Sequence, residues 1–96
     1  MTMTKRVFTR TEIAEIVSQS LDSLGYTWRH GQDDEYTHLF DDLYLDSLDG
    51  FDMVLILEEA FDVEGADENF SRTFTIYSII ETTCDLLRTQ GRFAGA

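Results

Sequence analysis

The fold is decided by residues 46–62, which read DSLDGFDMVLILEEAFD. In a helix, residues three or four positions apart lie on one face. Apolar residues at this spacing predict a buried face made up of Phe51, Met53, Val54, Leu57, Ala60 and Phe61. Asp46 is of a residue type that commonly caps the start of a helix, so we expect a helix over about 47–61.

The opposite side of this predicted helix carries a second row, made up of Leu48, Asp52, Leu55 and Glu59. Two leucines in an otherwise acidic exposed row are unusual. Single leucines are nevertheless ordinary on protein surfaces. The row therefore has two interpretations, a scattered surface or a face that docks a partner, and periodicity alone leaves both open.

Two further helices flank this stretch. Apolar periodicity predicts a helix over about 9–24, with a Thr9–Glu12 capping box at its start and Gly25 just past its end. The same periodicity predicts a last helix over about 75–88. No alternating apolar pattern longer than a few residues indicates a strand.

The segments between and outside these helices complete the predicted organisation. Residues 25–45 lack periodicity, and their aromatic side chains predict a long loop pinned across the core. We expect a short helix near 67–72 and flexible ends at 1–8 and 91–96, which leaves one domain over 9–90. The predicted fold class is all-α, a small bundle of three main helices plus one short helix.

Charge restricts the partners of the protein. The 96 residues contain 19 Asp and Glu but only 7 Lys and Arg, for a net charge of −12. Between Arg29 and Arg72 there is no Lys or Arg, whereas 14 of the 19 carboxylates lie there. Nucleic acid and anionic membrane surfaces are therefore disfavoured partners. The acidic segment is either a solvated face or a docking surface for a basic partner.

Metal and disulfide sites find little support in the sequence. Cys84 is the only cysteine, which excludes an intramolecular disulfide and a multi-cysteine metal site. Neither Gly50 nor Gly65 can be registered as the sixth residue of a calcium-binding EF-hand loop. No run of 18 apolar residues and no secretory signal occurs, so we expect no membrane span and a cytoplasmic location.

Catalytic motifs are also missing. His38 lies nine residues before Ser47 in the irregular loop, which does not amount to an oriented Ser-His-acid set. No glycine-rich phosphate loop or dinucleotide fingerprint is present. The sequence gives no basis for a catalytic residue.

One pattern is more specific than composition. Asp46-Ser47-Leu48-Asp49 opens the central helix, and the pattern continues with Val54, the run LEEAFD at 57–62, Asp67-Glu68 and the Thr75-capped last helix. This combination resembles the acyl carrier proteins over about residues 39–87. In that family the serine holds a covalent 4′-phosphopantetheine, which comes from coenzyme A and carries acyl groups as thioesters. The resemblance implies an acyl-carrier-like bundle that is not itself an enzyme, with Ser47 as the attachment residue.

The resemblance also implies roles for neighbouring residues. Asp46, Leu48 and Asp49 flank the prosthetic group and form part of the surface read by a phosphopantetheinyl transferase. The positions that contact basic partner enzymes correspond to Leu48, Asp52, Leu55, Glu58, Glu59 and Asp67. The acyl chain of the family lies between helices, so the implied pocket lining is Met53, Val54, Leu57, Phe61, Ile79 and Ile80.

Two positions depart from the family pattern. Tyr44 stands where a Gly commonly precedes the motif, and Gly65-Ala66 replaces a common Ile-Pro. A specialised carrier is therefore as plausible as the housekeeping fatty-acid carrier. The implied function is that of a monomeric carrier that serves acyl-transferring, condensing and modifying enzymes of fatty-acid or polyketide type. The alternatives are a peptidyl or aminoacyl carrier, and an acidic carrier-like adaptor without the prosthetic group.

Overall fold

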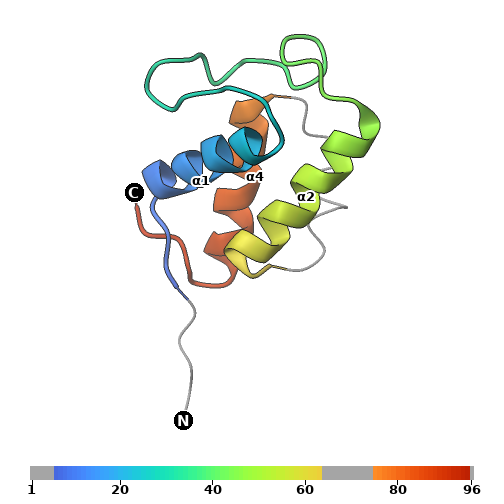
Figure 1. The fold of residues 1–96 in the computed structure, drawn as a ribbon. Helices are drawn as coiled ribbons and strands as arrows, with labels where there is room; N and C mark the ends of the chain where they lie inside the picture. Colours follow the sequence, from blue (N-terminus) through green and yellow to red (C-terminus); the bar gives the residue numbers. More distant parts are fainter. Residues whose placement is uncertain (1–5, 64–74, 96) are drawn as a thin grey trace.

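A computed structural model of the chain describes residues 6–63 and 75–95, and these residues contain three α-helices (Figure 1). They are α1 (Arg10–Ser23), α2 (Ser47–Phe61) and α4 (Ile76–Thr89), and α1 packs against both of the others. No strand occurs among the described residues, so the all-helical class is confirmed for them. The short helix expected near 67–72 lies outside the described residues.

The ends of α1 follow the local sequence signals. Thr9 accepts a hydrogen bond from the backbone N–H of Glu12, and the Glu12 carboxylate accepts one from the Thr9 N–H, which is the predicted capping box. At the other end Gly25 takes a positive φ of 92°. The N–H of Gly25 donates to Asp22 O and that of Tyr26 to Leu21 O, at 3.0 and 2.9 Å. This pair of bonds is a Schellman motif, which fixes the chain direction after the helix.

A single apolar core lies between the helices and the long loop. It consists of Phe8, Ile13, Ala14, Val17, Leu21, Trp28, Leu39, Leu45, Met53, Leu57, Phe61, Val63, Ile76, Ile79, Ile80, Cys84 and Leu87. Loop residues Trp28, Leu39 and Leu45 are thus as buried as the helix residues, which agrees with a loop pinned across the core. None of the described helices is long and apolar enough to cross a membrane.

Polar contacts fasten the same loop to α1 and α4. The Arg10 guanidinium donates to Glu35 at 2.7 and 3.0 Å and to Glu81 at 2.9 Å, and these bonds lower the pKa of the Glu35 carboxyl. The backbone N–H groups of Ile76 and Tyr77 donate to carbonyls of the loop, at 3.1 and 2.7 Å. The first N–H groups of a helix have no partner within the helix. The loop therefore supplies acceptors that the start of α4 needs.

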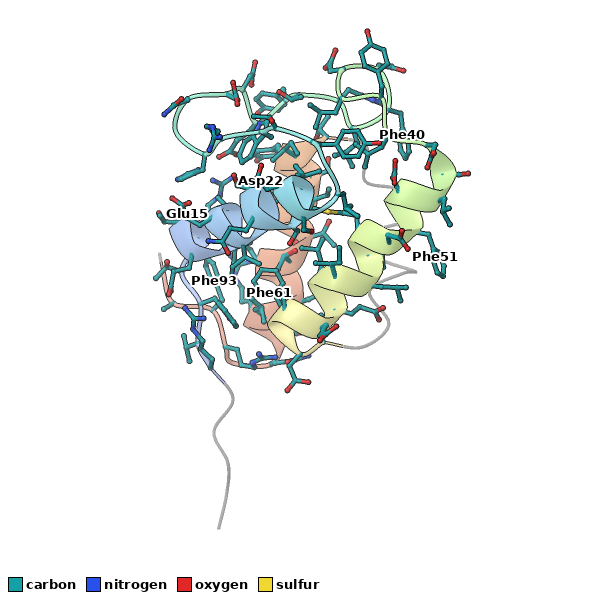
Figure 2. The ribbon with its side chains drawn as sticks, viewed as in Figure 1. Glu15, Asp22, Phe40, Phe51, Phe61 and Phe93 are labelled. Atoms are coloured by element: carbon teal, nitrogen blue, oxygen red, sulfur yellow. The ribbon has the colours of Figure 1, made fainter. Side chains whose placement is uncertain are left out.

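The buried face of α2 is narrower than the sequence pattern indicates. Met53, Leu57 and Phe61 are buried, but Phe51 is 58% exposed and Ala60 is also exposed. Figure 2 shows Phe51 on the outer side of α2. At about 100° per residue, Phe51 lies roughly 200° around the helix from Met53. The prediction that Phe51 and Ala60 belong to the core face is therefore wrong.

The two ends of the described chain are packed together rather than free. The Phe8 N–H donates to Arg92 O and the Ala94 N–H to Phe8 O, at 2.9 and 2.8 Å. The Phe8 ring also packs edge-on against Phe61, with ring centroids 5.0 Å apart. Residues 92–94 thus belong to the packed structure. The prediction of a flexible tail over 91–96 is therefore wrong for these three residues.

Arg92 is the reason that this segment is held in place. Its buried guanidinium donates to the backbone carbonyls of Phe61 at 2.6 Å, Asp62 at 3.2 Å and Arg6 at 3.1 Å. The carbonyls at a helix C-terminus have no partner within the helix. Arg92 therefore caps α2 and ties it to both ends of the described chain.

We predict that Arg92→Lys lowers the free energy of unfolding by about 1–3 kcal/mol, because lysine keeps the charge but not the planar fork of donors. Denaturant unfolding followed by circular dichroism measures the change. Arg29→Lys is the matched control, since Arg29 is exposed and its exchange is expected to change stability by less than about 0.5 kcal/mol. Equal stability of wild type and Arg92→Lys would show that the guanidinium contacts contribute nothing.

Candidate functional site

Ser47 is the first residue of α2, and its side chain is exposed. Asp46 precedes it with extended backbone and accepts a hydrogen bond from the backbone N–H of Asp49 at 2.7 Å. Asp46 is therefore the helix cap that the sequence predicts. The N–H groups of Ser47 and Leu48 have no acceptor within the helix and lie at the positive end of its dipole. An anionic group attached to Ser47 would be stabilised at this position.

Tyr26 joins the site from the end of α1. Its phenol donates a hydrogen bond to Oδ2 of Asp49, two residues after Ser47. This bond, with partial desolvation and the charge of Asp46, raises the pKa of Tyr26 to about 12. Sequence reasoning missed Tyr26, because it lies 23 residues before Asp49 in a segment without periodicity.

Phe40 covers the first turn of α2 from another direction. A Cβ added to Gly50 would lie 3.5 Å from the Phe40 ring, so the ring packs directly over the helix backbone at this position. Figure 2 shows Phe40 beside the first turn of α2. The Asp46 cap, the Tyr26 hydrogen bond and this ring together fix the start of the helix next to Ser47.

Tyr44 adopts a backbone conformation that favours glycine. Its φ is 63°, whereas its side chain is 79% exposed. Residues with a Cβ seldom take this left-handed conformation. Tyr44, where the sequence departs from the acyl carrier pattern, thus has the backbone geometry that glycine would adopt without strain.

The carboxylates of α2 are free of ion pairs with the described cations. Arg6 pairs with Glu12, Arg10 with Glu35 and Glu81, and Arg88 with Asp85. The arginines that form ion pairs therefore neutralise carboxylates of α1, the long loop and α4. The predicted docking residues Asp52 and Glu58 are half-buried, and Glu59 is exposed. Asp67 lies outside the described residues.

Large apolar side chains accompany these charges on the outer side of α2. Leu48 is 68% and Leu55 49% exposed, and Phe51 lies between them in sequence at 58%. Leu48 and Leu55 are the leucines of the predicted exposed row. Phe51 adds an aromatic ring that sequence reasoning assigned to the core. We refer to Leu48, Phe51, Asp52, Leu55, Glu58 and Glu59 as the α2 outer face.

The residues implied as an acyl pocket lie in one packed core. Met53, Leu57, Phe61, Ile79 and Ile80 are all buried. Val54 is half-buried and packs against the same cluster. Five of the six thus belong to the apolar core, and Val54 borders it.

The remaining reactive side chains form no second site. Burial raises the pKa of the Cys84 thiol to about 11, so this buried group stays protonated at neutral pH. Within the described ranges, no three His, Cys, Asp or Glu side chains come together as a metal site.

Comparison with protein-family models and with curated proteins finds no match for this chain.

We predict that Tyr26 ionises near pH 12, and that Asp49→Ala returns its pKa toward the ordinary value of 10. Because the folded-state pKa is raised, the stabilisation from this bond is complete below pH 10 and is lost as the pH rises through 12. The ultraviolet titration difference between wild type and Tyr26→Phe reports the Tyr26 phenolate. A Tyr26 that ionises at its ordinary pKa in the wild type would show that the bond is not formed in solution.

Proposed function

We propose that the protein is an acyl carrier, with a 4′-phosphopantetheine on Ser47 that holds acyl intermediates as thioesters. The observation that carries this proposal is the position of Ser47, exposed as the first residue of a helix that Asp46 caps. The protein catalyses no reaction itself in this proposal. It presents its cargo to biosynthetic enzymes of fatty-acid or polyketide type.

The surroundings of Ser47 fit the phosphodiester of the prosthetic group. Unpaired N–H groups of the first turn and the positive end of the helix dipole favour a negative charge on the serine oxygen. The capped first turn holds the attachment point rigidly. The terminal thiol of the bound group supplies the thioester chemistry, and the chain itself supplies position.

Attachment requires a separate transferase. The Ser47 oxygen replaces adenosine 3′,5′-bisphosphate on the phosphorus of coenzyme A that bears the pantetheine. The serine O–H bond and one P–O bond break, one P–O bond forms, and the proton leaves with the products. No side chain of this chain has to activate Ser47, which agrees with the lack of a histidine motif beside it.

The α2 outer face is proposed as the surface that partner enzymes bind. Its carboxylates lack ion pairs with the described cations, so none of those cations would compete with a basic partner. Leu48, Phe51 and Leu55 add apolar area that such a partner would bury. The net charge of −12 favours fast, salt-sensitive association with basic enzymes.

The acyl chain is proposed to enter the core between α2 and α4. Met53, Leu57, Phe61, Ile79 and Ile80 all belong to the buried cluster. Because protein cores are closely packed, a chain can enter only if these side chains move apart. A pocket of this kind would form on loading.

The test is intact mass spectrometry after incubation with coenzyme A, magnesium and a broad-specificity phosphopantetheinyl transferase. We expect the wild type to gain the mass of one phosphopantetheine, and Ser47→Ala to gain none. Ser23→Ala is the matched control, because Ser23 is also exposed but is the last residue of α1. This variant should gain one phosphopantetheine, as the wild type does. A wild type that stays unmodified with several such transferases contradicts the proposal.

For the α2 outer face, we predict that Asp52→Lys combined with Glu59→Lys slows association with the transferase roughly tenfold or more at low salt. Stopped-flow binding measures the rate, and circular dichroism checks that the fold is kept. Glu15→Lys with Asp22→Lys makes the same change in net charge on exposed positions of α1 (Figure 2). If both double variants associate equally slowly, net charge and not the α2 outer face governs docking.

A further inference from the structure

Tyr26 is placed by the end of α1 with little freedom. Its backbone N–H closes the Schellman motif on Leu21 O, and the positive φ of Gly25 turns the chain just before it. Trp28, two residues later, is buried and donates its indole N–H to Asp34 O at 2.9 Å. Tyr26 thus lies between two fixed points, so the position of its ring is set by the fold.

The partner of Tyr26 is a side chain of the candidate site. Asp49 stands in the first turn of α2, where its backbone N–H donates to Oδ1 of Asp46. Its carboxylate accepts the Tyr26 hydroxyl on Oδ2. Backbone and side chain of Asp49 are therefore both held by hydrogen bonds, in the same first turn of α2 as Ser47.

Resting on the proposed function, we propose that Tyr26 is a positioning residue for the modification of Ser47, which orients the Asp49 carboxylate for a basic group of the transferase. A phenol is a neutral donor, so it fixes the carboxylate without cancelling its charge. An ionised carboxyl group has about four lone-pair sites, and the hydroxyl uses one of them. The other oxygen stays available to a guanidinium or ammonium group.

Pre-orientation should act on binding rather than on the chemical step. Ordering one side chain at an interface costs about 0.5–1.5 kcal/mol of binding free energy. A carboxylate that is already oriented in the free protein avoids this cost. This corresponds to a roughly 2- to 10-fold change in affinity. Tyr26 touches no reacting atom in the proposal, because it acts through Asp49.

The experiment compares steady-state kinetics of coenzyme A-dependent modification for wild type, Tyr26→Phe, Asp49→Ala and the double variant. We expect Tyr26→Phe to raise KM roughly 2- to 10-fold with kcat unchanged. Asp49→Ala should raise KM at least as much, and adding Tyr26→Phe to it should have no further effect. Tyr36→Phe is the matched control, since it removes an exposed tyrosine hydroxyl elsewhere and should leave KM unchanged.

The outcomes separate this inference from the function on which it rests. A wild type that no transferase modifies overturns both. If the wild type is modified with the same KM as Tyr26→Phe, the positioning role alone is overturned. A lower KM for Tyr26→Phe also overturns it, because the phenol would then shield Asp49 from the transferase. Tyr26→Phe could also raise KM by the same factor in the Asp49→Ala background as in the wild type. Tyr26 would then act independently of Asp49, which also overturns the positioning role.

Discussion

The hydrogen bond from the Asp49 N–H to the Asp46 carboxylate determines where α2 begins, and the functional features of the molecule depend on that register. With this start, Ser47 becomes the exposed first residue, and Met53, Leu57 and Phe61 turn into the core. A start one residue later would leave Ser47 outside the helix, whereas Met53, Leu57 and Phe61 would still share one face because of their spacing. The cap therefore sets the position of Ser47, and the apolar spacing sets the buried face.

The described arginines show how the fold uses its few cations. Arg10 fastens the long loop to α1 and α4, and Arg92 caps the last turn of α2 through backbone carbonyls. Neither neutralises a carboxylate in the middle of α2. Self-repulsion along that helix opposes folding, and the buried apolar cluster has to offset it. If the α2 outer face binds a basic partner as proposed, stability and partner recognition place opposite demands on the same carboxylates.

Much of the helical framework could be predicted from the sequence, because its signals are local. Thr9 with Glu12 marks the start of α1, Gly25 marks its end, and Asp46 marks the start of α2. Phe51 was assigned wrongly, since a run rich in apolar residues fits more than one helical face. The face of α2 that is buried depends on packing partners elsewhere in the chain, and Phe51 lies outside that face.

The contacts that hold the two ends of α2 are long-range, and they were not predictable. Tyr26 meets Asp49 across 23 residues, and Arg92 meets Phe61 across 31. Each joins segments that only the folded chain brings together, and no periodicity or motif links them. The positive φ of Tyr44 was equally hidden, because tyrosine gives no sign of a left-handed backbone. Local chemistry thus indicated Ser47, while the residues that hold its surroundings emerged from the fold.

Phe8 and Ala94 lie side by side at the end of the molecule where Arg92 caps α2. Ser47 lies at the other end of this 15-residue helix, about 20 Å away at 1.5 Å per residue. A linker or tag joined to either end of the described fold therefore leaves on the side away from the serine. Neighbouring ends of this kind suit circular permutation and attachment to a solid support. On a molecule immobilised through its ends, Ser47 would face the solution.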